Sequence, residues 1–360
     1  MKKVLLSAVL GLLAASSAMA ITDGQTYEKV NGIGIQNEWV ISRVHTGELQ
    51  FSALPIANNY ARSAVMSKGV IYVARTCAID ITVPGDTLLQ SAVYKYDAAN
   101  GDFLGEMPLT LNGSPYANSA QASLQANNIG VDNFGHLWLA PYASAENAKI
   151  PLYSLNGETG ELTLVTTFEK GDVVERVDYI DVMGDITREE AELNVMAAGA
   201  SSPTIYRWHF DQGDFSDEPE GGFDGDPYMD ITAFVPDDVT MWGFAPVIRM
   251  VLGEDPDDMD TYYHGELFYV DGFYSAPILY DTTGSMIDSF ADIVAEENWA
   301  LIPEYGTNGI AEFHLDGRNF VVYSKAQYTG DGHGCQALIC EMGEGMSLYG
   351  MEKYWQIPAD

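Results

Sequence analysis

The chain has 360 residues, with 52 aspartates and glutamates against 17 lysines and arginines, so its formal net charge is −35. A charge of this sign and size repels the phosphate backbone, which excludes nucleic-acid binding as the function. The hydrophobic fraction of 47% excludes an intrinsically disordered chain.

The N-terminus has the pattern of a secretory signal peptide. Two lysines are followed by the apolar run VLLSAVLGLLAA and by the small-residue pattern AMA at 18–20, which suits signal peptidase. We therefore expect residues 1–20 to be removed and residues 21–360 to form one exported domain, periplasmic, on the outer surface or secreted. No later stretch is apolar for long enough to span a bilayer, so no membrane span is expected after cleavage.

A hydrophobic strand, a polar turn with glycine and a second apolar strand recur along the rest of the chain. The clearest copy is VYKYDAANGDFLGEM at 93–107, and further copies lie at 39–54, 152–168, 205–218, 278–290 and 338–351. Glycine suits such turns because it tolerates positive φ. The turn glycines are Gly47, Gly101, Gly160, Gly213, Gly284 and Gly343, at intervals of 54, 59, 53, 71 and 59 residues. Unrelated hairpins would not keep so regular a period.

A second hairpin precedes these turns from the second copy onward. Its copies lie at 59–75, 127–141, 176–199, 241–272 and 308–324. Each has a hydrophobic strand, a turn and a β-branched or aromatic strand. One repeating unit is therefore four short antiparallel strands, which at this period is typical of a β-propeller blade. The sequence predicts an all-β fold, a β-propeller of six blades, with five or seven as alternatives.

The outer hairpin also carries a family resemblance. The stretch YKYDAANGDFLGE resembles the repeat of quinoprotein-type and YVTN-type propellers, in which a strand, Asp-x-x-x-Gly and a second strand recur. This pattern extends over most of the chain. The overall resemblance is to secreted bacterial propellers, and it implies a fold but no activity. The quinoprotein repeat has a Trp after the turn, where this chain has Leu104, Leu164 and Phe215. We therefore do not expect quinone-dependent dehydrogenase activity.

The interval between Gly213 and Gly284 is the longest, and its extra residues are acidic. They lie at 211–230 and 253–265, which are rich in Gly, Pro and Asp as loops are. Clustered carboxylates separated by glycine suit Ca²⁺, which binds oxygen ligands, although neither stretch fits an EF-hand loop. The candidate calcium ligands are Asp224, Asp226, Asp230, Asp255, Asp257, Asp258 and Asp260. Solvated acidic loops are the alternative.

A departure from the strand pattern follows at 286–303. Its apolar residues Ile287, Phe290, Ile293 and Val294 recur at helical spacing. This spacing predicts a helix packed across the edge of a blade.

The starts of the inner strands are the predicted ligand site. In a propeller these strands line the central channel, and ligands bind at its mouth. Aligned by repeat, their starts carry Tyr60, Arg62, Asn128, Arg176, Asp178, Trp242 and Asn308. Arginines at equivalent points of different blades suit an anionic or sugar-like ligand, and Tyr or Trp can stack on a sugar ring. The same positions suit salt bridges and packing between blades, so both interpretations stay open.

The sharp catalytic motifs are absent from the sequence. It contains no G-x-S-x-G, P-loop or H-E-x-x-H pattern, and its six histidines are scattered. We therefore predict a binding or interaction module for a glycan, a small ligand or a protein at the cell envelope, rather than an enzyme. The alternatives are a calcium-dependent hydrolase or lyase with its site at the channel mouth, and a structural surface-assembly protein. Ca²⁺ is the one cofactor that the sequence suggests.

Overall fold

The computed structural model describes the chain from residue 61 onward, with gaps. The described residues are 61–75, 91–116, 126–143, 149–169, 176–187, 193–199, 204–210, 228–230, 246–251, 267–272, 275–281, 284, 286–289, 307–315, 318–326, 335–341 and 354–357. All of them lie in strands, turns or loops, so this part of the chain is all-β, as predicted. It contains no helix with the length and apolarity that a membrane span requires. The predicted signal peptide and the repeat at 39–54 lie outside these residues.

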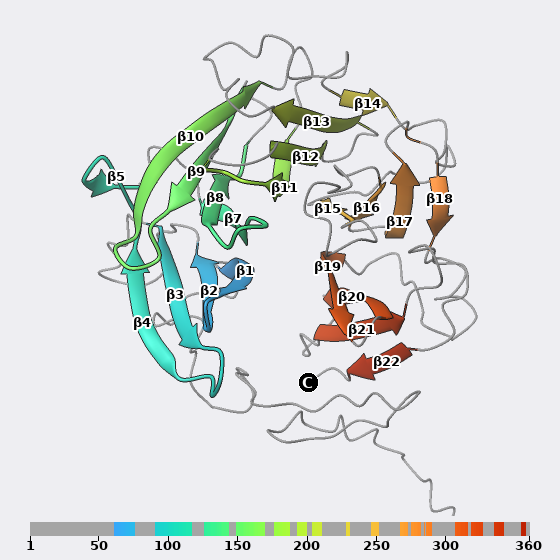
Figure 1. Ribbon diagram of the computed structural model, residues 1–360, viewed down its shortest axis with the longest axis horizontal. Helices are drawn as coiled ribbons and strands as arrows, with labels where there is room; N and C mark the ends of the chain where they lie inside the picture. Colours follow the sequence, from blue (N-terminus) through green and yellow to red (C-terminus); the bar gives the residue numbers. More distant parts are fainter. Residues whose placement is uncertain are drawn as a thin grey trace, which may run out of the picture.

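The strands form five sheets that follow one another around a central axis (Figure 1). The first sheet contains β1 (Ala61–Ser67), β2 (Val70–Arg75), β3 (Ala92–Asp97) and β4 (Phe103–Pro108). The second contains β7 (Ala126–Val131), β8 (Leu137–Pro141), β9 (Lys149–Leu155) and β10 (Glu161–Glu169). The third contains β11 (Val177–Gly184), β12 (Leu193–Gly199), β13 (Thr204–Phe210) and β14 (Tyr228–Asp230). The fourth contains β15 (Val247–Met250), β16 (Leu267–Gly272), β17 (Ser275–Asp281) and β18 (Met286–Ser289). The fifth contains β19 (Thr307–Leu315), β20 (Arg318–Ala326), β21 (Cys335–Glu341) and β22 (Tyr354–Ile357).

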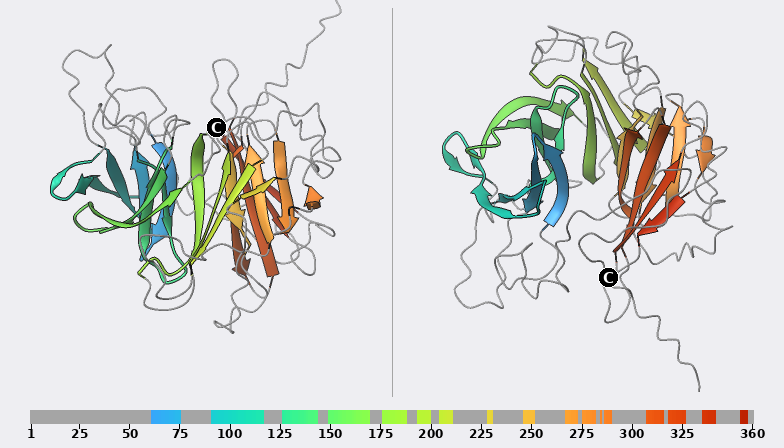
Figure 2. Two further views of the ribbon diagram at one scale, coloured as in Figure 1. Left: turned by 90° about the horizontal axis from the view of Figure 1, so that it is seen from above. Right: turned by 60° about the horizontal axis from the view of Figure 1, so that its bottom comes forward.

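Within each sheet these four strands pair antiparallel in chain order, as the repeat predicts. The first strand of each sheet lies nearest the axis and the fourth lies at the rim, and the side view shows the strands running roughly along the axis (Figures 1 and 2). The fold is therefore propeller-like. Among the described strands the first and last sheets do not pair, and the five sheets do not close a ring. The count of six blades stays a prediction.

The second sheet has an addition that the repeat does not predict. A short hairpin of β5 (Thr110–Leu111) and β6 (Ser114–Pro115) follows the first sheet in the chain, and β5 pairs parallel with β10. The Glu161 carboxylate accepts hydrogen bonds from the Thr110 hydroxyl and from the Gly113 amide. The hairpin thereby covers the exposed edge of the second sheet with strand from the linker before it.

Three predicted boundaries need correction. The partner of β13 is β14, which begins at Tyr228, ten residues beyond the predicted hairpin at 205–218. The partner of β21 is β22, which begins at Tyr354, beyond the predicted hairpin at 338–351. Residues Met286–Ser289, predicted as the start of a helix, form strand β18 and pair with β17. Backbone pairing with the sheet edge overrides the local helical spacing here.

The core lies between successive sheets. Three hydrophobic clusters fill the interfaces between the first and second, the second and third, and the third and fourth sheets. On β12, Val195 and Ala197 pack toward the second sheet, whereas Met196 and Ala198 pack toward the fourth. Successive side chains of a strand point to opposite faces, so a strand buried on both sides is apolar at nearly every position. This explains the unbroken run VMAA in the sequence.

Glycine is needed for two different reasons, at the turns and at one strand pair. The predicted turn glycines within the described residues, Gly101, Gly160 and Gly284, have φ of 75°, 78° and 82°, as their role requires. Gly130 on β7 has a different reason, because it pairs with Trp138 on β8. A Cβ at Gly130 would lie 2.1 Å from the Trp138 ring. The indole therefore lies directly over bare backbone.

Polar side chains of the inner strands join the first sheet to the second and the second to the third. The Ser63 hydroxyl on β1 donates to the Asn127 carbonyl at 3.0 Å and accepts from the Ile129 amide at 2.8 Å. On β7, the Asn128 amide group donates to the Ile180 carbonyl of β11 at 2.6 Å. These bonds satisfy backbone groups that the sheet ladders leave open, which buried polar groups require.

Candidate functional site

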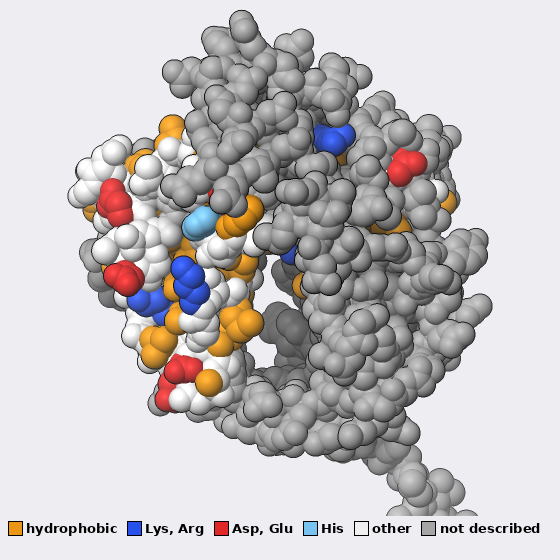
Figure 3. Space-filling model, in the orientation of Figure 1, with side chains coloured by type: hydrophobic (Ala, Val, Ile, Leu, Met, Phe, Trp, Pro, Cys, Tyr) orange, Lys and Arg blue, Asp and Glu red, His pale blue; other side chains and the backbone are white. Residues whose placement is uncertain are grey.

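A pocket of about 730 Å³ lies where the first three sheets meet, at the end that carries the β1–β2, β7–β8, β9–β10 and β11–β12 turns. We call it the turn-face pocket. Its lining residues are Ser67, Lys68, Val70, Tyr72, Lys95, Leu104, Gly135, His136, Leu137, Ser154, Leu155, Asn156, Gly157, Glu158, Glu161, Thr163, Ile186 and Thr187. The space-filling view shows histidine, basic and apolar surface gathered on this part of the molecule (Figure 3). Its volume is that of a typical small-ligand site.

The charged groups of the turn-face pocket divide by sheet. Lys68 on the β1–β2 turn and Lys95 on β3 come from the first sheet, whereas Glu158 and Glu161 come from the β9–β10 hairpin of the second. Among the described residues, neither lysine has an ion-pair or hydrogen-bond partner for its side chain. The pocket therefore offers donors on one wall and acceptors on the other.

Tyr72 lines the pocket from the first sheet and lies against the β9–β10 turn of the second. The residue is 8% exposed. Burial raises the pKa of the Tyr72 hydroxyl, and the nearby negative charge of Glu158 adds to the shift. Gly157 lies so close that a Cβ there would be 2.9 Å from both the Tyr72 hydroxyl and the Leu137 side chain. Glycine at this turn thus lets the second sheet pack against Tyr72.

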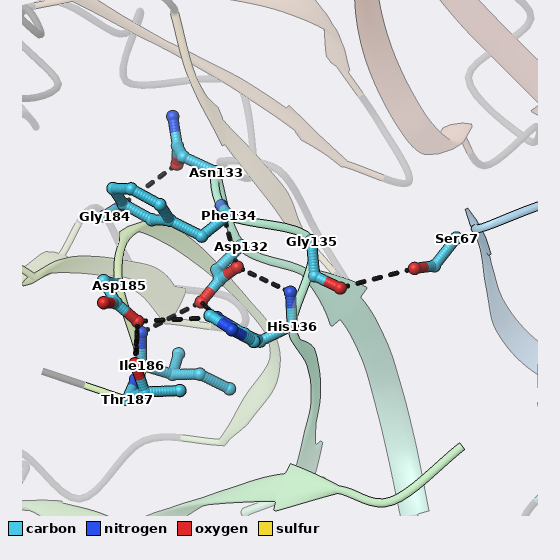
Figure 4. Close-up of polar contacts among 10 residues, drawn as sticks. All are labelled: Ser67, Asp132, Asn133, Phe134, Gly135, His136, Gly184, Asp185, Ile186 and Thr187. Carbon is cyan, nitrogen blue, oxygen red and sulfur yellow. Dashed lines mark hydrogen bonds and ion pairs between the residues drawn. The ribbon is translucent and has the colours of Figure 1, made fainter. Parts of the chain in front are cut away.

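At the third-sheet side of the pocket, Asp132, His136 and Asp185 lie together (Figure 4). Asp132 begins the β7–β8 turn, and its side chain is fully buried. Its Oδ1 accepts hydrogen bonds from the amides of Phe134 at 3.0 Å and His136 at 2.8 Å. Its Oδ2 accepts from the Ile186 amide at 3.0 Å, across the interface to the third sheet. The carboxylate is therefore held by three backbone donors.

His136 completes this cluster. Its Nδ1 lies 3.0 Å from Oδ2 of Asp132 and 3.4 Å from Oδ1 of Asp185. The Asp185 Oδ1 also accepts hydrogen bonds from the amide and the hydroxyl of Thr187, at 2.7 and 2.6 Å. A reciprocal pair of bonds between Asn133 and Gly184, at 2.9 and 3.2 Å, fastens the two turns beside it. The imidazole thus packs into a clasp between two sheets.

The three side chains of this cluster are close enough together to be compared with the ligands of a metal ion. One ligand atom from each of Asp132, His136 and Asp185 lies within 4.8 Å of the others. Both oxygens of Asp132 already accept backbone hydrogen bonds, and the His136 nitrogen in the cluster faces those carboxylates. A metal ion held by the three residues would have to take the place of the Nδ1 proton that these carboxylates accept. We therefore interpret the three residues as a hydrogen-bonded clasp between the second and third sheets.

The structure describes the side chains of three predicted channel-mouth residues and brings two of them, Arg176 and Asp178, into contact. Arg176 donates from Nε to the Asp178 carboxylate at 2.8 Å, and its guanidinium lies 5.5 Å from the centre of the Tyr142 ring. Asn128 is buried and holds the Ile180 carbonyl. The Asn128 bond joins two sheets, and the Arg176–Asp178 pair lies at the start of one inner strand. The ligand-binding role of these residues stays a prediction.

The side chains of the remaining predicted site residues are not among those that the structure describes. Arg62 and Asn308 lie in strands β1 and β19, and Asp230 lies in β14, with only their backbones described. Tyr60, Trp242, Asp224, Asp226, Asp255, Asp257, Asp258 and Asp260 lie outside the described residues. The calcium site therefore stays a prediction as well.

Sequence reasoning missed the turn-face pocket and its histidine. The available signal was the stretch DNFGH at 132–136, in which an Asp begins a tight turn and a His ends it. An Asp at that place accepts the turn amides, so it would have directed attention to His136. The partners in the third sheet lie more than fifty positions away, and local spacing does not reveal them.

Another group of buried acids lies between the third and fourth sheets. Asp181 accepts hydrogen bonds from the Arg249 guanidinium and from the Met250 amide, both at 2.7 Å. Burial raises the pKa of Asp181, with the Arg249 charge acting against the shift. Asp271 is fully buried, and burial raises the pKa of its carboxyl well above the usual value, opposed in part by the Gly272 amide. Asp181 thus joins the third sheet to the fourth, and neither acid lines the turn-face pocket.

Comparison with known proteins bears on the fold. No family model matches the chain, and no curated protein matches it. Among solved structures, a DUF4623 family protein from Bacteroides eggerthii is similar, with a TM-score of 0.53 and 10% identity. The match covers 84% of this chain and 61% of that protein, so this chain spans less than two thirds of its length.

Two further matches are weaker in geometry. The periplasmic gluconolactonase of Pseudomonas aeruginosa has a TM-score of 0.42 and 12% identity, covering 84% of this chain and 72% of that one. A 6-phosphogluconolactonase-like protein of Bacteroides uniformis, assigned that activity provisionally, has a TM-score of 0.38 and 14% identity, covering 82% and 70%. At such identities a likeness concerns the fold alone. The five sheets and the likeness to the Bacteroides eggerthii structure together make the described part of the chain an all-β, propeller-like fold.

Proposed function

We propose that this chain is an exported binding module, periplasmic, secreted or on the cell surface, that takes a small polyhydroxylated ligand such as a glycan in the turn-face pocket. One observation carries the proposal: two lysines of one sheet and two glutamates of the next line a single pocket of about 730 Å³. Export depends on the signal peptide that the sequence predicts at residues 1–20.

The charges of the pocket favour a ligand that both donates and accepts hydrogen bonds. A lysine ammonium only donates and a carboxylate only accepts, whereas a hydroxyl group does both. A sugar can therefore span from Lys95 to Glu158 and satisfy each wall with adjacent hydroxyls. The apolar surface of Tyr72, Leu104 and Leu137 suits the C–H face of a sugar ring. A polyanion fits less well, because the net charge of −35 repels it.

A saccharide array followed by calorimetry tests the proposal. Immobilised neutral and acidic mono- to tetrasaccharides are presented to the full chain, and the best binder is then titrated in solution. We expect Lys95→Gln and Glu158→Gln each to weaken binding about tenfold, since a hydrogen bond to a charged group contributes roughly 1.5–3 kcal/mol.

Lys149→Gln is the matched control, because Lys149 is an exposed lysine on β9 outside the pocket. It should bind like the wild type. If no saccharide binds, or if the two pocket variants bind as well as the control, the proposal is wrong.

A further inference from the structure

His136 presents its two ring nitrogens to different surroundings. Nδ1 faces the clasp, where Asp132 and Asp185 supply carboxylate oxygens at 3.0 and 3.4 Å. The ring itself lines the turn-face pocket, and the side chain is 41% exposed. Among the described residues, Nε2 has no hydrogen-bond partner. Nε2 is therefore the nitrogen that can act in the pocket.

The clasp decides where the proton of the neutral imidazole sits. Both groups that face Nδ1 are carboxylates, which accept hydrogen bonds, so Nδ1 must be the donor. Asp132 cannot turn away, because three backbone amides hold its two oxygens. With the proton on Nδ1, the lone pair of the neutral ring is on Nε2.

We propose that His136 is a general base of the turn-face pocket, oriented by Asp132 and directed at a hydroxyl group or a water molecule bound there. In the step, the O–H bond of that group breaks and its electron pair stays on oxygen. The proton forms a new N–H bond at Nε2, and the resulting imidazolium is stabilised by the Asp132 carboxylate. The proposal rests on the proposed function for its hydroxyl donor, and it extends the pocket from binding to proton transfer.

The other charged groups of the pocket agree with this role. Lys68 and Lys95 lie on the first-sheet wall, where a positive charge stabilises the negative charge that develops on the oxygen. Glu158 and Glu161 lie on the second-sheet wall, and Glu161 is engaged with the β5–β6 hairpin. Asp132 and Asp185 are the groups facing Nδ1. No further described histidine lines the pocket.

The tautomer is the first test, and it needs no ligand. The full chain is labelled with ¹⁵N-histidine, and two-bond ¹H–¹⁵N spectra are recorded above the titration of the ring, with His136→Gln to assign the signal. We expect the pattern of an imidazole protonated at Nδ1. A signal protonated at Nε2 would overturn the proposal, because the nitrogen in the pocket would then be a donor.

The reactivity of the ring is the second test. Diethyl pyrocarbonate acylates a nitrogen lone pair, and peptide mapping by mass spectrometry locates the product. We expect His136 of the folded wild type to react, and to react several-fold more slowly in Asp132→Asn, because a neutral amide no longer stabilises the positive charge that the ring acquires as Nε2 is acylated. Asp97→Asn is the control, because Asp97 accepts from the Ala99 amide in an exposed turn of the first sheet.

The outcomes separate this proposal from the proposed function. If His136 stays unmodified in the folded protein but reacts after unfolding, the general-base proposal is wrong, whether or not a saccharide binds in the array. If Asp132→Asn does not fold, the tautomer and the reactivity of His136 in the wild type still decide whether the general-base proposal holds. An array without binders, together with a reactive ring protonated at Nδ1, overturns the polyhydroxylated ligand and leaves water as the proton donor.

Discussion

The side-chain amide of Asn128 on β7 donates a 2.6 Å hydrogen bond to the backbone carbonyl of Ile180 on β11, the inner strand of the next sheet. Asn128 is 7% exposed, so water does not replace this bond easily. Together with Ser63 one sheet earlier and Asp181 one sheet later, it forms a series of side-chain bonds between inner strands. The sheets are thus joined by polar contacts as well as by their apolar cores.

Asn128→Ala should destabilise the protein by about 1–3 kcal/mol, because it leaves the Ile180 carbonyl buried without its partner. Chemical denaturation followed by tryptophan fluorescence measures the change. Asn100→Ala, in an exposed turn where the amide contacts Asp102, is the matched control and should cost less than half as much. Equal losses of stability in both variants would show that the bond between the inner strands matters no more than a bond in an exposed turn.

Gly130→Ala should destabilise the protein by about 1–3 kcal/mol or more, because its Cβ would overlap the Trp138 ring at 2.1 Å. Trp138→Leu should also be destabilising, since the indole belongs to the core between the second and third sheets. The double variant should lose less stability than the sum of the two single losses, because without the indole the new Cβ no longer overlaps a ring. Strict additivity in a double-mutant cycle would show that the ring is not what excludes the Cβ.

The stability of the protein should fall as the pH rises above the ordinary carboxyl pKa of 3.8, in part because of Asp271. Burial raises the pKa of this carboxyl in the folded state, so the folded chain keeps the proton while the unfolded chain loses it. The loss should continue until the pH passes the raised value. Asp271→Asn removes the titration and should flatten the profile.

The pH dependence is read from denaturation midpoints between pH 4 and pH 8. The advantage of Asp271→Asn over the wild type should grow with pH across this range. Asp97→Asn, in an exposed turn, should follow the wild-type slope. An Asp271→Asn profile parallel to that of the wild type would mean that this carboxyl does not titrate differently on folding.

Chelation should lower the melting temperature by several degrees if the acidic stretches at 211–230 and 253–265 bind calcium. A cation that binds the folded chain alone stabilises it by mass action. Differential scanning calorimetry with EDTA, and with excess Ca²⁺ restored, measures the shift, and Mg²⁺ at the same ionic strength is the control. An unchanged melt would rule out a stabilising calcium site.

The repeat could be predicted because its signals are local. Hairpins, turn glycines and alternating apolar residues lie within a few positions of one another, and the predicted pairs became β1–β4, β7–β10 and the sheets after them. The positions of β14 and β22 could not be predicted, since each begins more than ten residues after the end of the strand with which it pairs. The parallel contact of β5 with β10 joins segments about fifty residues apart, with no periodic signal.

The candidate site was less predictable than the fold. The channel-mouth positions follow from repeat alignment, which finds equivalent places but not what each side chain contacts. Arg176 and Asp178 occupy one such place, and the alignment did not predict the ion pair that joins them at the start of β11. His136 acquires its character from Asp132 and from Asp185 of the following sheet. Such a combination exists only in three dimensions.

The bond from the Ile186 amide to Asp132 has a consequence for biosynthesis. Most of the pocket wall belongs to the first two sheets, but the turn that carries His136 is fastened by the third. A nascent chain that has emerged only as far as β10 would hold nearly every lining residue and still lack the oriented imidazole. Competence of the pocket would then report that three consecutive repeats have been exported and have docked.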